Sequence, residues 1–129
     1  MADTHRRIVF FRAALVVAVV LVSHLATSER AYPGVEQLHD KVSHILAFAT
    51  LAFLADFSFP ASRFGLRKIV VLLAYGVLIE VVQSFLPYRE ASWLDVVGDA
   101  AGIAVYAIVF PLLASVPALH RLRELRRIE

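Results

Sequence analysis

Several polar side chains that can bind ligands or move protons interrupt the apolar stretches of this sequence. They form three groups along the chain: Asp40, Lys41 and His44, then Glu80, Gln83 and Arg89, then Asp95 and Asp99. Carboxylates accept hydrogen bonds and bind cations, histidine exchanges protons near neutral pH, and lysine and arginine bind phosphates. The set could therefore recognise a polar ligand, hold a divalent cation or carry acid–base chemistry.

The composition indicates that these groups sit in a membrane protein. Hydrophobic residues make up 60% of the 129 residues, and the net charge is only +2, which is too apolar for an ordinary soluble domain. The sequence has no cysteine, which excludes disulfides, zinc–thiolate sites and a thiol nucleophile. The basic residues lie in short clusters between apolar runs, so we expect membrane lipids as partners and no nucleic acid.

Four apolar runs approach the length that a helix needs to cross a bilayer, about 20 residues for about 30 Å of hydrocarbon. They cover residues 8–26, 42–59, 69–86 and 96–116, with turn-forming residues between them at Pro33-Gly34, Pro60, Gly65 and Pro87. The sequence therefore predicts an all-α integral membrane bundle of about four transmembrane helices, with residues 1–129 forming a single membrane domain. A cleavable signal peptide is the alternative for the first run, but no clear small-x-small cleavage site follows it.

Lysine and arginine residues are divided unevenly between the two sides that these runs define. One side has nine: Arg6, Arg7, Arg63, Arg67, Lys68, Arg121, Arg123, Arg126 and Arg127. The other side has three: Arg30, Lys41 and Arg89. Because cytoplasmic loops carry the excess of basic residues, we expect both termini in the cytoplasm and the polar groups in the outer leaflet.

Helical spacing predicts that each polar group shares one helix face. Asp40 and His44 are four residues apart, as are Asp95 and Asp99, and Glu80 is followed three residues later by Gln83. A charge that faces lipid costs at least about 2.5 kcal/mol near the bilayer centre. We therefore expect the second, third and fourth helices to turn these faces toward one another.

Small residues on the fourth run indicate how the helices could approach so closely. Gly98 and Gly102 are spaced to form one small-residue face, which favours close helix packing in membranes. We expect the first run to be peripheral to the site.

Some of these residues also have structural explanations. Asp40 and Asp95 are predicted in first helical turns, where the macrodipole favours an acid, and Ser92-x-x-Asp95 resembles a capping box. Asp56 is expected to pair with Arg63, Arg67 or Lys68.

Glu80 has the weakest structural explanation, because the dipole opposes an acid near a helix C-terminus. We expect Gln83, His44 or Arg89 to stabilise it, or its carboxyl group to stay protonated.

These residues also form an ordered pattern: Asp40-Lys41-x-x-His44, Glu80-x-x-Gln83, Pro87-x-Arg89 and Asp95-x-x-x-Asp99-x-x-Gly102. From about residue 40 to 106, the chain resembles the VanZ-like family of small bacterial membrane proteins. The resemblance implies a multi-pass protein of the bacterial inner (cytoplasmic) membrane with a role in the cell envelope. The family's namesake is associated with teicoplanin resistance. Two positions depart from the family pattern, which commonly has Asn in place of Asp99 and often Gly in place of Tyr106.

Three functions remain open from the sequence. The first is recognition of lipid-linked wall precursors or lipidated glycopeptide antibiotics in an outer-leaflet polar pocket. The second is an intramembrane enzyme that acts on lipid-phosphate or envelope substrates through the carboxylates and His44, although no compact metal motif such as H-E-x-x-H and no recognisable serine nucleophile occurs. The third is a small transporter or proton-relay protein that uses Glu80, His44 and Asp99. The sequence predicts no metal and identifies neither a cofactor nor an oligomeric state.

Overall fold

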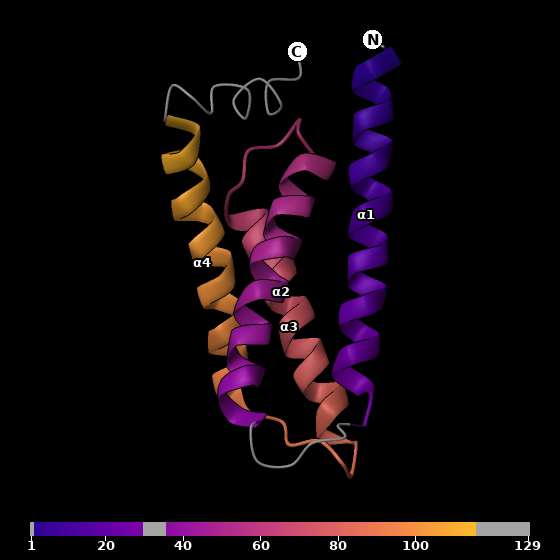
Figure 1. Cartoon of the computed structure of the whole chain (residues 1–129), viewed down its shortest axis with the longest axis vertical. Coiled ribbons are helices and arrows are strands. Elements are labelled where there is room, and N and C mark those ends of the chain that lie inside the picture. Colours follow the sequence, from indigo (N-terminus) through magenta and orange to yellow (C-terminus); the bar gives the residue numbers. More distant parts are fainter. Residues whose placement is uncertain (1, 30–35, 116–129) are drawn as a thin grey trace.

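The computed structural model describes residues 2–29 and 36–115, and this part of the chain contains four α-helices and no strand. They are α1 (Ala2–Thr27), α2 (Glu36–Ser58), α3 (Leu66–Ser84) and α4 (Trp93–Ser115). The helices run alternately up and down, so the start of α1 and the end of α4 lie at the same end of the bundle (Figure 1). The predicted all-α bundle is confirmed. The predicted break at Pro33-Gly34, Arg30 and the basic tail 120–129 lie outside the described residues.

Three of the helices are long and apolar enough to cross a membrane: Thr4–Thr27 in α1, His39–Ser58 in α2 and Trp93–Ser115 in α4. The third helix, α3, is not among them because its 19 residues include Arg67, Lys68 and Glu80. It nevertheless lies beside the other helices within the bundle (Figure 1). The expectation of a fourth crossing segment stays a prediction.

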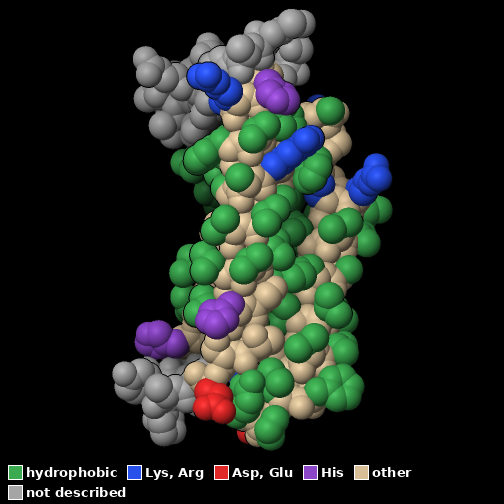
Figure 2. All heavy atoms as spheres, turned by 90° about the vertical axis from the view of Figure 1, so that its right-hand side faces the viewer, with side chains coloured by type: hydrophobic (Ala, Val, Ile, Leu, Met, Phe, Trp, Pro, Cys, Tyr) green, Lys and Arg blue, Asp and Glu red, His purple; other side chains and the backbone are tan. Residues whose placement is uncertain are grey.

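The surface over α1 has the pattern of a lipid-facing helix. Val16, Val17, Val20 and Leu25 are each more than half exposed. On the face drawn in Figure 2, Lys and Arg side chains lie only toward the upper end, whereas Asp and Glu lie at the lower end. Hydrophobic side chains cover the length between them, as expected for a protein whose sides contact hydrocarbon.

The central element of the bundle is α2, which packs against all three other helices and most extensively against α4. Its residues Phe48, Leu51 and Ala52 are almost completely buried, and Ile103 of α4 packs in the same core cluster. Two glycines make the contact with α4 close. A Cβ atom on Gly102 would collide with the backbone carbonyl of Ile45, and one on Gly98 would lie 3.2 Å from the Cβ of His44.

Polar side chains from other helices satisfy the carbonyl groups at the C-terminal end of α2. The Lys68 ammonium donates hydrogen bonds to the carbonyls of Phe59 (3.0 Å) and Ser62 (2.7 Å), and it forms a buried ion pair with Asp56 (2.9 Å). The predicted pairing of Asp56 with a nearby cation is thus confirmed, with Lys68 as the partner. Arg12 of α1 donates to the carbonyl of Ser58 at 3.1 Å. These bonds hold α1, α2 and α3 together at the end opposite the polar groups described below.

The close contact at Gly102 predicts that one added methyl group weakens the bundle. We expect Gly102→Ala to destabilise the protein by about 1–3 kcal/mol, because the new Cβ must push the α2 backbone away, despite the better helix propensity of alanine. Thermal unfolding in detergent micelles, followed by circular dichroism, measures this loss. Gly65→Ala is the matched control, since its Cβ would meet only an ordinary contact at 3.9 Å, and loss of glycine at the N-cap of α3 should cost less than about 1 kcal/mol. Equal stability of the two variants would contradict the packing argument.

Candidate functional site

The centre of the polar site is a contact between α2 and α4. Nδ1 of His44 donates a hydrogen bond to Oδ1 of Asp99 at 2.6 Å. Asp99 has an exposed fraction of 0%, and its second oxygen, Oδ2, is buried without a hydrogen-bond partner among the described residues. With Asp99 ionised, Nδ1 is the protonated nitrogen, and in the neutral imidazole Nε2 then carries the lone pair.

The buried carboxylate of Asp99 fits because α3 has a glycine opposite to it. A Cβ atom on Gly76 would collide with Oδ2 of Asp99 and would lie 3.2 Å from the ring of Phe48. Gly76 is four residues before Glu80, so the two share one face of α3. All three helices therefore contribute to the site, as the shared faces predict.

Two further carboxylates lie beside the imidazole of His44. Nε2 lies 3.8 Å from Oδ2 of Asp95, and ligand atoms of Asp40, His44 and Asp95 all lie within 4.8 Å of one another. Asp95 is in the first turn of α4, as predicted. Asp40 is not in a first turn, because α2 begins four residues earlier, at Glu36. The macrodipole therefore does not explain Asp40.

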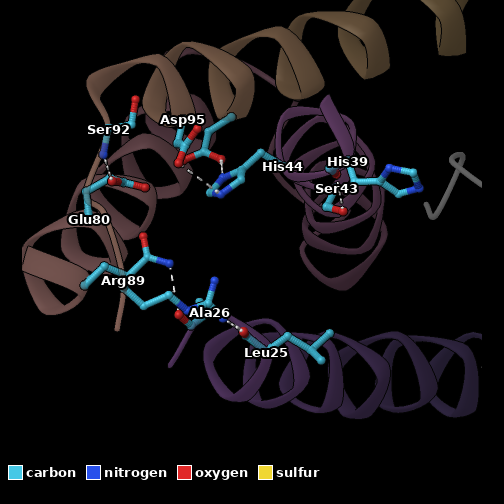
Figure 3. A network of polar contacts seen from close by, with 11 residues as sticks. Leu25, Ala26, His39, Ser43, His44, Glu80, Arg89, Ser92 and Asp95 are labelled. Carbon is cyan, nitrogen blue, oxygen red and sulfur yellow. Dashed lines mark hydrogen bonds and ion pairs between the residues drawn. The ribbon is translucent and has the colours of Figure 1, made fainter. Parts of the chain in front are cut away.

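Glu80 reaches across to the start of α4. Its Oε2 accepts a hydrogen bond from the backbone N–H of Ser92 at 2.8 Å (Figure 3). In the predicted capping box, the side chain of Asp95 would accept a hydrogen bond from the N–H of Ser92. In the structure Glu80 accepts that bond, and the backbone N–H of Asp95 donates to the carbonyl of Ser92 at 2.9 Å. Although the dipole of α3 opposes an acid at residue 80, the dipole of α4 favours it there. Glu80 of α3 thus has a structural role at the start of a different helix, α4.

The C-terminal end of α1 is bound by side chains that follow Glu80 in the sequence. Gln83 donates to the carbonyl of Ala26 at 2.9 Å, and Tyr88 donates to the carbonyl of Thr27 at 2.8 Å. Arg89 donates to the carbonyl of Leu25 (Figure 3) and to that of Ser28. These donors bind carbonyl groups that lack a partner within the helix. The first helix thus contributes backbone acceptors, and none of its described residues lines the pocket at this end of the bundle, as expected of a peripheral helix.

These groups border a pocket of about 510 Å³ at the end of the bundle where α2 and α4 begin. Its walls come from the start of α2, the end of α3, the α3–α4 connection and the start of α4. The lining residues are Asp40, Lys41, Gln83, Pro87, Tyr88, Arg89, Glu90, Ser92, Leu94 and Asp95. The pocket is therefore polar and carries charges of both signs.

The candidate residues from the sequence divide into two layers. Asp40, Lys41, Gln83, Arg89 and Asp95 line the pocket. His44, Glu80 and Asp99 do not line it and lie among the helices beside Asp95. Gly98 and Gly102 face α2.

Two residues that sequence reasoning missed, Gly76 and Tyr88, complete the arrangement together with Ser92, whose predicted capping role did not include Glu80. Gly76 makes room for Asp99, Ser92 gives its N–H to Glu80, and Tyr88 binds the end of α1. A lone glycine on the same face as Glu80 was an available signal. The contacts of Ser92 and Tyr88 depend on the path of the connection and left no pattern in the sequence.

Comparison with known proteins identifies the family of this chain. A family model described as VanZ/LLP1 matches residues 4–114. The chain belongs to the VanZ/LLP1 family. The match is wider than the predicted stretch from 40 to 106 and includes α1, whose end binds Gln83 and Arg89. No curated protein and no solved structure matches the chain.

The two departures from the VanZ-like pattern have visible consequences. Asp99 supplies the carboxylate that holds His44. Tyr106 packs against the rings of Phe64 and Phe110, and its hydroxyl donates to Oδ2 of Asp56 at 2.7 Å. The added tyrosine is therefore part of the polar network at the end opposite the pocket.

The bond between Glu80 and Ser92 predicts different effects for two substitutions. Glu80→Leu leaves a backbone N–H without its partner, and we expect it to destabilise the protein by about 1–3 kcal/mol. Glu80→Gln keeps an acceptor oxygen and should cost less than about 1 kcal/mol. Thermal unfolding of both variants in micelles compares the two losses. A Leu variant as stable as the wild type would show that Glu80 does not hold the start of α4.

Proposed function

We propose that this membrane protein takes the polar head group of a lipid-linked saccharide into the pocket at the end of the bundle. The observation that carries the proposal is the position of this charged, open pocket of about 510 Å³ beside helices whose outer sides are apolar. A ligand that joins a polar head to a hydrocarbon tail can occupy both surroundings at once. Lipid-linked precursors of the cell wall have this construction.

The pocket lining favours a head group with hydroxyl groups over a bare phosphate. Asp40, Glu90 and Asp95 provide carboxylates, which accept hydrogen bonds from sugar hydroxyls, whereas Lys41 and Arg89 provide the positive charges. Gln83 uses its amide N–H to bind α1, and its Oε1 is buried without a partner in the described part of the chain. That oxygen can accept one further hydroxyl.

The proposal places the pocket on the outer side of the bacterial cytoplasmic membrane. Arg63, Arg67 and Lys68 lie in and after the connection between α2 and α3, at the end opposite the pocket (Figure 1). An excess of basic residues at that end supports a cytoplasmic position for it. The head group of a precursor that faces outward could then enter the pocket from the membrane surface.

The single tryptophan offers a direct measurement of binding. Trp93 is 74% exposed and stands between Ser92 and Leu94, which both line the pocket. We expect a polyprenyl-phosphate-linked sugar to change Trp93 fluorescence saturably in micelles. Lys41→Gln should weaken the apparent affinity about tenfold, because a charge-assisted hydrogen bond to the phosphate is lost. Arg63→Gln, at the other end of the bundle, is the matched control and should bind like the wild type.

Two outcomes of this titration would overturn the proposal. The first is equal affinity for polyprenyl phosphate without a sugar. The second is tighter binding of teicoplanin than of the lipid-linked sugar, which would identify a lipidated glycopeptide as the ligand.

Catalysis at the same head group is a second candidate, and the orientation of His44 is the observation that favours it. A histidine held through Nδ1 by a buried carboxylate, with Nε2 on the side of Asp95, which lines the pocket, resembles the arrangement of a general base. In a hydrolysis, Nε2 would take a proton from water while the water oxygen bonds to phosphorus. The bond from phosphorus to the departing oxygen would break, and that oxygen would receive the proton from His44.

The catalytic candidate predicts turnover of the lipid-linked sugar by the purified protein. We expect His44→Gln to lower the rate by at least about a hundredfold, the usual contribution of a positioned base. His39→Gln is the matched control, because His39 is exposed on the same helix and points away from the cluster (Figure 3). Chromatography of the released products measures the rate, and absence of turnover in the wild type would exclude this candidate.

The transport function receives less support. The buried layer that separates the His44 site from the Asp56–Lys68 pair is apolar in the described residues and includes Phe48, Leu51 and Ile103. A proton relay would need polar groups or water through this layer.

A further inference from the structure

The residues around Nε2 of His44 form a set of donors that metal ions use. Atoms of Asp40, His44 and Asp95, one from each residue, lie within 4.8 Å of one another. They come from α2 and the first turn of α4, which explains why no compact metal motif occurs in the sequence. One imidazole nitrogen together with carboxylate oxygens suits a first-row transition-metal dication better than Mg²⁺ or Ca²⁺, which prefer oxygen ligands alone.

His44 is already arranged as a metal ligand would be. Metal-binding histidines usually donate their second ring N–H to a carboxylate or carbonyl group, which fixes the tautomer and the ring orientation. Asp99, which is completely buried, accepts this hydrogen bond from Nδ1 at 2.6 Å. The lone pair of Nε2 is therefore available on the side of Asp95.

The distance between His44 and Asp95 fits a shared ion better than a hydrogen bond. Nε2 and Oδ2 are 3.8 Å apart, which is beyond the hydrogen-bond range. Two ligands that each lie about 2.1 Å from one ion are at most about 4.2 Å apart. Asp40 is half-buried at the edge of the pocket, and a side-chain shift of less than about 1 Å would bring its oxygen into the same range.

Glu80 supplies an independent indication that this space takes a ligand. Its side chain is more than nine-tenths buried, and Oε1 has no hydrogen-bond partner among the described residues. Its other oxygen binds Ser92, while the carboxylate is directed toward Asp95 and His44 (Figure 3). A buried carboxylate oxygen without a partner is costly, and a cation beside Asp95 would compensate it.

We propose that Asp40, His44 and Asp95 bind one first-row divalent transition-metal ion at the inner side of the pocket, with Glu80 as a nearby fourth carboxylate. The ion would occupy Nε2, so His44 would act as a ligand and not as a base. It would also offset the negative charge of the acids that line the pocket. Cation binding itself does not require the proposed lipid ligand.

Zinc titration of the metal-free protein tests this site directly. The full chain, purified in detergent micelles without a polyhistidine tag and stripped with a chelator, is titrated with Zn²⁺ by calorimetry. We expect one ion per chain, and at least tenfold weaker binding for His44→Gln and for Asp40→Asn. Asp40 lies at the pocket edge, so its variant keeps the test valid if His44→Gln does not fold. Asp99→Asn should weaken binding about tenfold, through loss of the carboxylate that orients His44.

The matched control is His39→Gln, which changes an exposed histidine of α2 and should bind Zn²⁺ like the wild type. Electron paramagnetic resonance with Mn²⁺ should detect one coordinated imidazole nitrogen, and this signal should disappear in folded His44→Gln. The proposal is overturned if the wild type shows no saturable binding, or if His44→Gln and Asp40→Asn bind as tightly as the wild type. Because no lipid is added, these results are separate from failure of lipid recognition.

Discussion

The close approach of α2 and α4 is the constraint on which the rest of the structure depends. Gly98 and Gly102 let α4 lie against the backbone of α2 where larger residues would separate the two helices. At that distance His44 reaches Asp99, and Asp40 and Asp95 meet at the other side of the imidazole ring. Gly76 has the same effect on α3, since only a residue without a side chain leaves room there for the buried carboxylate of Asp99. The polar site is thus a consequence of backbone proximity, which small residues provide in apolar surroundings.

A second constraint acts on the helix ends. Hydrocarbon offers no hydrogen bonds, so backbone groups at the end of a helix need partners from the protein itself or from the membrane surface. Arg89 and Gln83 bind the last carbonyls of α1, Lys68 binds carbonyls that follow α2, and Glu80 accepts the N–H that precedes α4. Several polar residues of the family pattern therefore hold helices in place, and this role accounts for them without any ligand.

Periodicity and composition predict the helical bundle well, because apolar runs and turn-forming residues are local features. Spacing also predicts that the polar faces of α2, α3 and α4 share one region, since lipid excludes charges from any other face. Spacing does not predict which hydrogen-bond partner each of these side chains has. The expected partners of Glu80 are Gln83, His44 or Arg89, but Glu80 accepts a hydrogen bond from the backbone N–H of Ser92. The sequence does not indicate this partner, because every residue except proline has a backbone N–H. Arg89 is one of these expected partners, but it donates hydrogen bonds to carbonyl groups at the end of α1. The position of α1 relative to α3 is a long-range property of packing.

The groups that structural roles leave unexplained gather in one place. Of the four buried side-chain atoms without a hydrogen-bond partner among the described residues, three belong to Glu80, Gln83 and Asp99, and the fourth is the hydroxyl oxygen of Ser58. Each such atom costs about 1–3 kcal/mol relative to a satisfied one. Apolar residues of similar volume could fill these positions without this cost. A cation beside Asp95 would compensate Oε1 of Glu80, and a head group in the pocket could donate to Oε1 of Gln83, which lines it. Oδ2 of Asp99 lies on the other side, against Gly76, and belongs to the support of His44.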